Sequence, residues 1–169
     1  MQHTELYDRL GEPERMRDIA GLDLLNPDLR TSLDEIAERS ATLLEAPVSL
    51  VSVVLDTSQL ILGSHGVSGW VEQAQGTPAE WAMCTHTVLA GEPYCVIDGY
   101  EDPKHIDNPF LRMTGLRSYL GVPLLGVGGQ VIGAHCVIDA RRRIFTDVDL
   151  AVLTDGAEKV MRLLQAYPA

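Results

Sequence analysis

Cys84 and His86 are two residues of this chain that could act as a thiol nucleophile and its base. They lie in a segment whose pattern predicts a helix, where two residues of separation turn the side chains apart by roughly 200°. The two groups are therefore not expected to meet. Cys84 shares a helix face with Trp81 and Val88, at i−3 and i+4, which favours a buried thiol over a reactive one.

The other cysteines and histidines do not show the spacing of a metal site. His135 and Cys136 are adjacent on a predicted strand, so they point to opposite sides of the sheet. We therefore expect no metal ion. The three cysteines form no CxxC pair and are odd in number, which fits reduced thiols in a cytosolic protein better than a disulfide framework.

The polar segment from Asp98 to Pro109 is a natural place for a lid over a ligand. Its carboxylates could form a dyad or bind a cation, but such residues are common in loops because they bond to nearby backbone groups. A polar loop followed by a strand could aim donors and aromatic rings into one concavity. The residues that we expect there are Tyr100, His105, Arg112, Arg117 and Tyr119.

The first elements that would position these residues are a helix and a hairpin. Asn26-Pro27 is typical of a helix start, and apolar residues at helical spacing continue to Ala46. The β-branched run 48–56 predicts a central strand that is covered on both faces, with 59–64 as its neighbour. Residues 4–20 are charged, with sparse apolar positions, and predict only weak helical character.

The middle of the chain predicts two shorter helices. Thr77-Pro78-Ala79-Glu80 reads as a capping box that starts a helix ending at Gly91, and 94–97 returns as a strand. Asn108-Pro109 then starts a brief helix that Gly115 stops.

The last third predicts a long hairpin and a helix. Two apolar runs, 118–127 and 130–138, flank Gly128-Gly129, which suits a turn. No Lys-Ser/Thr follows these glycines, so a phosphate-binding loop is not indicated. Thr146 caps a final helix with an apolar stripe over 150–164. Together the elements predict an α+β fold with a mainly antiparallel sheet of five to six strands.

Composition excludes several classes of protein. With 169 residues, 46% of them apolar, we expect one domain over 26–166 and a partly helical N-terminal extension over 1–25. A net charge of -11 disfavours nucleic acid as a partner. The chain shows neither an apolar run of about 20 residues nor a secretory signal, so we expect a cytoplasmic protein without a membrane partner.

The order of several motifs resembles the GAF family of small-molecule-sensing domains. These motifs are Trp81-Ala-Met-Cys84-Thr-His86, Asp98-Gly-Tyr-Glu-Asp102-Pro-Lys-His-Ile-Asp-Asn108-Pro, the hairpin 115–139 and Phe145-Thr, and the similarity runs from about 33 to 164. The resemblance implies terminal helices on one face of the sheet and a pocket on the other, roofed by 98–115. The ligand-binding residues would be Trp81, Cys84, Asp98, Tyr100, Asp102, His105, Asn108, Arg112, Arg117 and Tyr119.

The resemblance implies a non-catalytic sensory domain, a homodimer, that binds a small molecule and relays a signal through its terminal helices to a separate signalling protein. The ligand is not identified. A covalent bilin is disfavoured, because 104–118 holds no cysteine. Cyclic nucleotide binding has weak support, because Phe145 and Asp149 fit that motif but Ile138-Asp139 and Leu150 replace its other elements.

Two alternatives stay open. The chain could resemble the free methionine-R-sulfoxide reductases, which are GAF enzymes, with Cys84 as the nucleophile and Cys95 as the resolving thiol. It could also be a dimerisation module whose interior beneath the lid is filled by apolar side chains.

Overall fold

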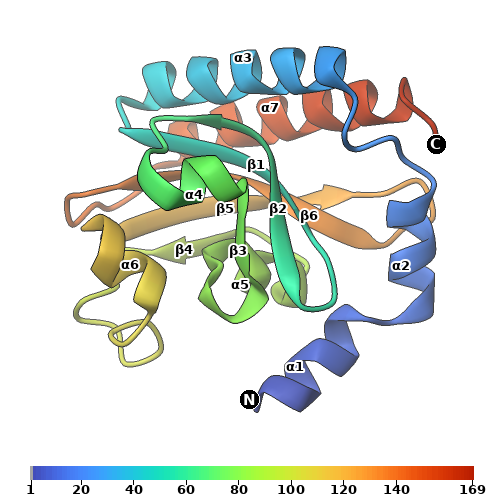
Figure 1. Ribbon diagram of the computed structural model, residues 1–169. Helices are drawn as coiled ribbons and strands as arrows, with labels where there is room; N and C mark the ends of the chain where they lie inside the picture. The colour runs from blue at the N-terminus through green and yellow to red at the C-terminus, as the bar shows by residue number, and fades with distance from the viewer. Residues whose placement is uncertain (1) are drawn as a thin grey trace.

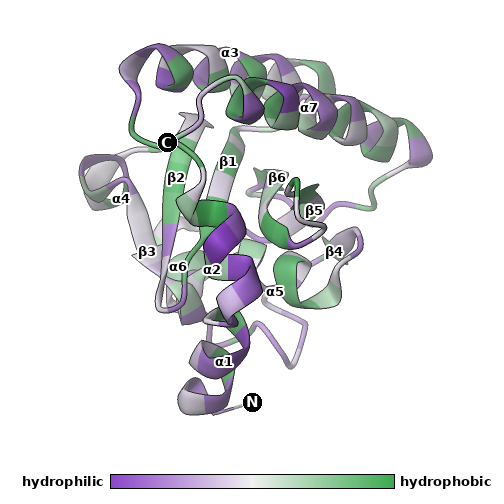
Figure 2. Cartoon of the chain, turned by 90° about the vertical axis from the view of Figure 1, so that its right-hand side faces the viewer, coloured by the Kyte–Doolittle hydropathy of each residue, from purple (hydrophilic) through white to green (hydrophobic). Residues whose placement is uncertain are grey.

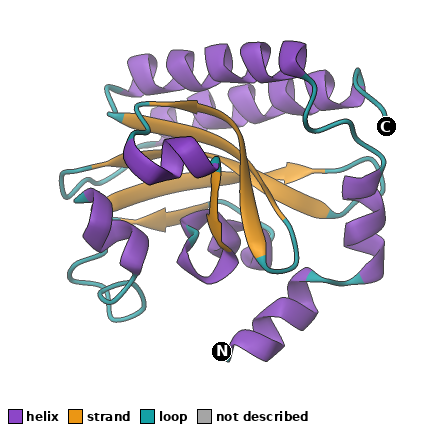
Figure 3. Ribbon diagram, in the orientation of Figure 1, coloured by secondary structure: helices purple, strands orange, loops and turns teal. Residues whose placement is uncertain are grey.

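A six-stranded antiparallel sheet forms the middle layer of the protein (Figure 1; Figure 3). The computed structural model describes residues 2–169. The strand order is β3-β2-β1-β6-β5-β4, and each neighbouring pair is antiparallel. The strands are β1 (Val48–Val54), β2 (Ser58–His65), β3 (Gly76–Pro78), β4 (Tyr94–Val96), β5 (Ser118–Leu125) and β6 (Val131–Asp139). This confirms the predicted α+β fold.

Two long helices, α3 (Pro27–Leu44) and α7 (Asp147–Gln165), lie side by side on one face of the sheet (Figure 1). Their apolar stripes pack against strand residues that include Val51, Val53 and Val137. The predicted caps of these two helices are present. Asn26 accepts bonds from the first backbone amides of α3, and Thr146 forms a capping box at the start of α7.

The opposite face is covered by shorter elements. These are α1 (His3–Leu10), the 3-10 helix η1 (Ala79–Trp81), α5 (Met83–Ala90) and α6 (Pro109–Thr114). Leu50, Cys136 and Ile138 face this second core, whereas Val51 and Val137 face the first. Strand β1 is buried along its whole length, which confirms its prediction as a central strand covered on both faces.

Three elements differ from the prediction. Thr77 does not cap a helix but lies in the edge strand β3, where its hydroxyl accepts a hydrogen bond from the side-chain amide of Gln59 at 3.0 Å. Helix α5 therefore begins at Met83. A short helix α4 (Gly69–Ala74) was not predicted. At the hairpin tip, only Gly129 of the expected Gly128-Gly129 turn has a positive φ, of 87°, and the loop closes between Gly126 and Gln130.

The N-terminal residues form two helices, α1 and α2 (Pro13–Ala20), more helical structure than the sequence predicts. They run along the end of the sheet and carry both hydrophobic and hydrophilic residues (Figure 2). Arg15 is buried, and its guanidinium donates to backbone carbonyls that include Val54 and Val131. Asp18 accepts bonds from the β5–β6 turn. No helix within residues 2–169 is long and apolar enough to cross a bilayer.

Candidate functional site

The lid, residues 98–117, is fixed at its root by an ion pair. The Asp98 carboxylate, in a side chain that is 3% exposed, accepts two bonds from Arg117 and one from the backbone amide of Tyr100. The Arg117 guanidinium also lies over the Tyr100 ring, 5.0 Å from its centroid. Three predicted site residues, Asp98, Tyr100 and Arg117, thus lie together, but their polar groups bind one another and do not line a pocket.

The charges at this root stabilise each other. The hydrogen bond from Arg117 lowers the pKa of Asp98 below its ordinary value, although burial opposes that shift. The same bond raises the pKa of Arg117. Both groups therefore stay charged over the physiological range, and the lid root does not act as an acid or a base.

A second group of rings joins His105 of the lid to α5 and β4. Tyr94 and His105 share a hydrogen bond of 2.6 Å, and His86 stacks on Tyr94 with 5.3 Å between ring centroids. His86 also meets His105 edge-on at 4.7 Å. His105 is 1% exposed, and within residues 2–169 its Nδ1 atom has no hydrogen-bond partner.

These histidines are held neutral. Burial, followed by the nearby His105 and Lys104, lowers the pKa of His86 to about 4. Burial also lowers the pKa of His105. His86 can therefore accept or donate a hydrogen bond as a neutral imidazole, but it is not a cation at neutral pH.

An open groove of about 800 Å³ lies along the flank of the lid. Its walls come from three parts of the chain: α1, the segment from η1 to α5, and the lid itself. Asn108 caps α6 and also donates to the Trp81 carbonyl at 3.2 Å, so it ties the lid to η1. The groove is lined by His3, Leu6, Ala79, Glu80, Trp81, Thr85, His86, Leu89, Pro103, Lys104, Asp107, Asn108 and Pro109.

The space directly between the sheet and helices α5 and α6 is filled by side chains. Cys84, Phe110, Leu111 and Tyr119 pack there in one buried cluster. The Tyr119 hydroxyl shares a hydrogen bond of 2.8 Å with Thr87 and does not face the groove. Of the ten residues expected to bind a ligand, Trp81 and Asn108 line the groove.

Two other predicted residues lie in the lid with local partners. The Asp102 carboxylate accepts a bond from the Lys104 backbone amide, and Arg112 donates to the Ile106 carbonyl and pairs with Asp107 at 3.5 Å. The groove residues that the sequence did not predict include His3 and Leu6. These belong to the N-terminal extension, and nothing in their spacing relates them to Trp81 some 75 residues later.

The thiols are arranged differently from the reductase alternative. Cys95 is exposed on β4, and its neighbour Val96 faces the core that contains Cys84. Because successive strand residues face opposite sides, Cys95 and Cys84 lie on opposite faces of the sheet. The neighbour of Cys84 is instead Cys136, with 3.8 Å between the sulfur atoms. No cluster of three or more His, Cys, Asp or Glu side chains within residues 2–169 could hold a metal ion.

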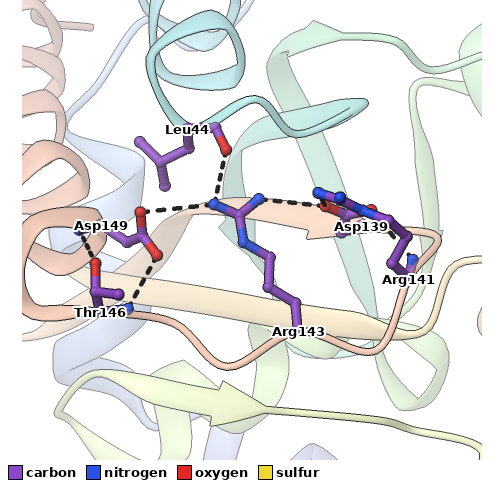
Figure 4. A network of polar contacts seen from close by, with 6 residues as sticks. All are labelled: Leu44, Asp139, Arg141, Arg143, Thr146 and Asp149. Carbon is purple, nitrogen blue, oxygen red and sulfur yellow. Dashed lines mark hydrogen bonds and ion pairs between the residues drawn. The ribbon is translucent and has the colours of Figure 1, made fainter.

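A polar network connects the two ends of the lid to the terminal helices. The Arg143 amide donates to the Ile97 carbonyl at 3.0 Å, and the Arg117 amide donates to the Asp139 carbonyl at 2.8 Å. Figure 4 shows the Arg143 guanidinium between the Leu44 carbonyl, at the end of α3, and the carboxylates of Asp139 and Asp149.

Asp139 is the centre of this network. Its carboxylate, 3% exposed, accepts bonds from Arg141 and Arg143, and these bonds keep its pKa below the ordinary value although burial, the largest single influence, acts to raise it. Arg143 is thus held between the ends of two helices, whereas Arg142, in the same turn, is exposed.

A separate hollow of about 540 Å³ lies on the other face, between α7 and the end of β5. Its lining includes Val122, Pro123 and Met161. It contains neither the histidines nor the lid, and for that reason we place the candidate site at the groove.

Comparison with known proteins agrees with this architecture. A cyclic di-GMP phosphodiesterase of Pseudomonas aeruginosa is 28% identical over 152 residues, which cover 89% of this chain and 25% of that protein. The chain thus spans about a quarter of the length of this curated relative.

Solved structures match at lower identity. The GAF domain of a phosphoenolpyruvate-protein phosphotransferase from Coxiella burnetii has a TM-score of 0.69 and 13% identity, covering 97% of this chain and 93% of that one. The type II free methionine-R-sulfoxide reductase from Thermoplasma acidophilum has a TM-score of 0.66 and 15% identity, and the match covers 83% of this chain and 95% of that one. These likenesses concern the fold. The model of the GAF domain family matches residues 28–164, and the chain belongs to that family.

Proposed function

We propose that this chain is a non-catalytic sensory domain of the cytoplasm that binds a small molecule in the groove beside the lid. Ligand binding would change how the lid packs, and the terminal helices α3 and α7 would carry that change to a signalling partner. A ligand can shift such an equilibrium only by binding the two arrangements unequally. The groove, with one wall formed by the lid, is a place where unequal binding can arise.

The observation that carries this proposal is the bonding around Arg143. Arg143 by itself contacts Ile97, directly before the lid, as well as Leu44 of α3 and Asp149 of α7. The other end of the lid is bonded to Asp139, which also binds Arg143. A displacement of the lid root therefore acts on both terminal helices through a few short contacts.

The lining of the groove indicates the kind of ligand. Trp81 and Leu89 offer apolar surface, whereas Glu80, Lys104 and Asp107 place charges of both signs around it. His86 adds a neutral imidazole. Such a lining suits a small polar molecule with an apolar part, which has both donors and acceptors.

We further propose that two copies associate through the outer faces of α3 and α7. Leu43 and Val148 are 56% and 72% exposed there, and Ile36 and Val152 line a hollow between the two helices. Burying these side chains against a second copy would remove apolar area from water. Such an arrangement would let a change in one copy reach the other.

The arrangement of the thiols supports a sensor rather than a reductase. Cys84 is 1% exposed, does not line the groove, and lies on the opposite face of the sheet from Cys95. We expect no reduction of free methionine-R-sulfoxide by the purified protein with dithiothreitol as reductant. Turnover that disappears in Cys84→Ser and persists in Cys95→Ser would replace the sensor proposal with the enzyme.

The decisive experiment is native mass spectrometry of the protein as purified from a cell extract. We expect a dimer that carries a reproducible non-covalent small mass. In Lys104→Ala and Glu80→Gln, which change the groove wall, that mass should be lost or reduced. Arg142→Ala, an exposed change outside the groove, is the matched control and should retain it.

Other outcomes would reject the proposal. A dimer without a bound molecule would support the dimerisation module, for which the filled space beneath α5 and α6 already provides an argument. A bound mass that is equally retained in Lys104→Ala, Glu80→Gln and Arg142→Ala would place the ligand outside the groove.

A further inference from the structure

Two buried cysteines from distant parts of the chain meet in the core beneath helix α5. The sulfur atoms of Cys84, on α5, and Cys136, on β6, are 3.8 Å apart, close to van der Waals contact. The two residues are 1% and 0% exposed. Cys84 also lies 3.5 Å from the Ser52 hydroxyl, which donates to its sulfur.

The surroundings make the two thiols unequal. The hydrogen bond with Cys136 lowers the pKa of Cys84 although burial acts to raise it, and bonds from Tyr119 and Ser52 add to the lowering. Burial raises the pKa of Cys136 well above the ordinary value. Cys84 is therefore the first of the pair to form a thiolate, which is the form that reacts with oxidants.

We propose that Cys84 and Cys136 are a redox modification site, which a hydroperoxide converts into a reversible intramolecular disulfide. The Cys84 thiolate attacks the distal oxygen of hydrogen peroxide, the O–O bond breaks, and the released hydroxide takes a proton to become water. The product is Cys84 sulfenic acid. The Cys136 sulfur then attacks the Cys84 sulfur, an S–S bond forms as the S–O bond breaks, and the leaving hydroxide takes the proton of the Cys136 thiol to become a second water. Two thiols are oxidised and one peroxide is reduced to two waters.

The oxidant must be small. Both sulfur atoms are enclosed by the core that includes Ser52, Tyr119 and helix α5, so entry requires a local opening of the helix. Hydrogen peroxide is little larger than water, whereas a protein disulfide would not fit. This separates the pair from Cys95, which is exposed and open to any oxidant.

The disulfide would alter the groove. An S–S bond is about 2.05 Å long, so the sulfur atoms must approach from 3.8 Å. Helix α5 is packed directly on β6 and carries both Cys84 and the groove residues Thr85 and His86. Drawing Cys84 towards the sheet thus displaces the wall that these two residues form. Oxidation and ligand binding would then influence each other.

The test uses the folded chain of 169 residues with Cys95→Ser, which leaves Cys84 and Cys136 as its two cysteines. The reduced protein is treated with hydrogen peroxide, then unfolded and exposed to N-ethylmaleimide, and its intact mass is measured. We expect the mass of a single chain that has lost two hydrogens and has taken up no maleimide. Dithiothreitol should restore two reactive thiols.

Matched variants identify the bond. In the same background, Cys84→Ser and Cys136→Ala each keep one thiol and should not give the mass of the disulfide. Cys136→Ala should instead accumulate the Cys84 sulfenic acid, which dimedone traps. Circular dichroism of each variant before oxidation establishes that it is folded.

Two results would overturn the proposal. In one, both thiols of the folded Cys95→Ser protein still react with maleimide after peroxide treatment, while the same chain in denaturant forms the disulfide. In the other, the folded protein gains oxygen without losing two hydrogens, which would mean that the sulfenic acid is not resolved by its neighbour.

Discussion

The Nε2 atom of His135 lies 2.8 Å from the hydroxyl oxygen of Ser40, and this contact joins strand β6 to helix α3. The other ring nitrogen, Nδ1, is 2.9 Å from the Leu50 carbonyl and must donate to it. Nε2 of the neutral ring therefore accepts from Ser40. The ring is fully buried, and burial lowers the pKa of His135 to about 4.

This arrangement predicts a loss of stability in mild acid. The unfolded chain takes up a proton at His135 below its ordinary pKa of 6.5, whereas the folded chain does so only near 4. The free energy of unfolding should therefore fall as the pH decreases through this window, by up to about 3 kcal/mol from this residue. Urea unfolding between about pH 7 and about pH 4.5 measures the slope.

His135→Gln is the comparison for that prediction, since it cannot gain the proton. Its unfolding free energy should depend less on pH than that of the unmodified chain, whatever its absolute value. His86, whose pKa is also lowered to about 4, should keep a residual slope in the variant. An unchanged slope in His135→Gln would show that the buried ring is not the titrating group.

The Arg143 network should contribute to both stability and coupling. Arg143→Gln removes the contacts to Asp139, Asp149 and the Leu44 carbonyl, and leaves the buried Asp139 carboxylate with fewer donors. We expect a loss of about 2 kcal/mol in unfolding free energy by chemical denaturation. Arg142→Gln alters an exposed arginine of the same turn and should stay within about 0.5 kcal/mol of the unmodified chain. Equal losses in both variants would contradict the assigned role.

The N-terminal helices should detach when Arg15 is shortened. Its guanidinium donates to the carbonyls of Leu10, Val54 and Val131, which lie in different elements, and a lysine cannot reach them together. Arg15→Lys should lower the unfolding free energy by about 2 kcal/mol and expose residues 2–25 to limited proteolysis. Arg17→Lys, an exposed change on the same helix, is the control. Protection of the segment in both variants would argue against this anchor.

The lid should loosen when its root is neutralised. Asp98→Asn removes the charge that binds Arg117, so amides of residues 99–116 should exchange hydrogen roughly tenfold faster. Asp107→Asn breaks the exposed pair with Arg112 and should change exchange little, because solvent screens that pair. Hydrogen exchange with mass spectrometry compares the two. Identical exchange in both would mean that the lid is held by its apolar contacts.

The sequence predicted the elements whose starts are marked by their own residues. Asn26, Asn108 and Thr146 bond to backbone amides within three residues, so local chemistry is enough to place those helices. Thr77 carries a similar pattern, but its hydroxyl accepts a hydrogen bond from the side chain of Gln59 on the neighbouring strand. The segment therefore joins the sheet. Such a partner, 18 residues away, is not visible in a local window.

The candidate site was predicted less well, because a groove depends on which surfaces meet. Tyr100, Asp98 and Arg117 were expected to face a ligand, yet they bind one another. The helical spacing turns His86 away from Cys84, and His86 lines the groove whereas Cys84 does not. The groove wall that α1 contributes depends on how the N-terminal extension packs against the domain, and the apolar pattern of that extension is weak.

The two outer strands of the sheet are unusually short. Strands β3 and β4 have three residues each, Pro78 ends the first, and Pro93 precedes the second. Within residues 2–169, β4 covers Tyr119–Gly121 of β5, and the uncovered end of β5 contains Pro123, which has no amide to donate. Both edges are poor templates for strand addition. The sheet is thus protected from joining edge to edge with another copy, and the association that we propose uses the helical layer instead.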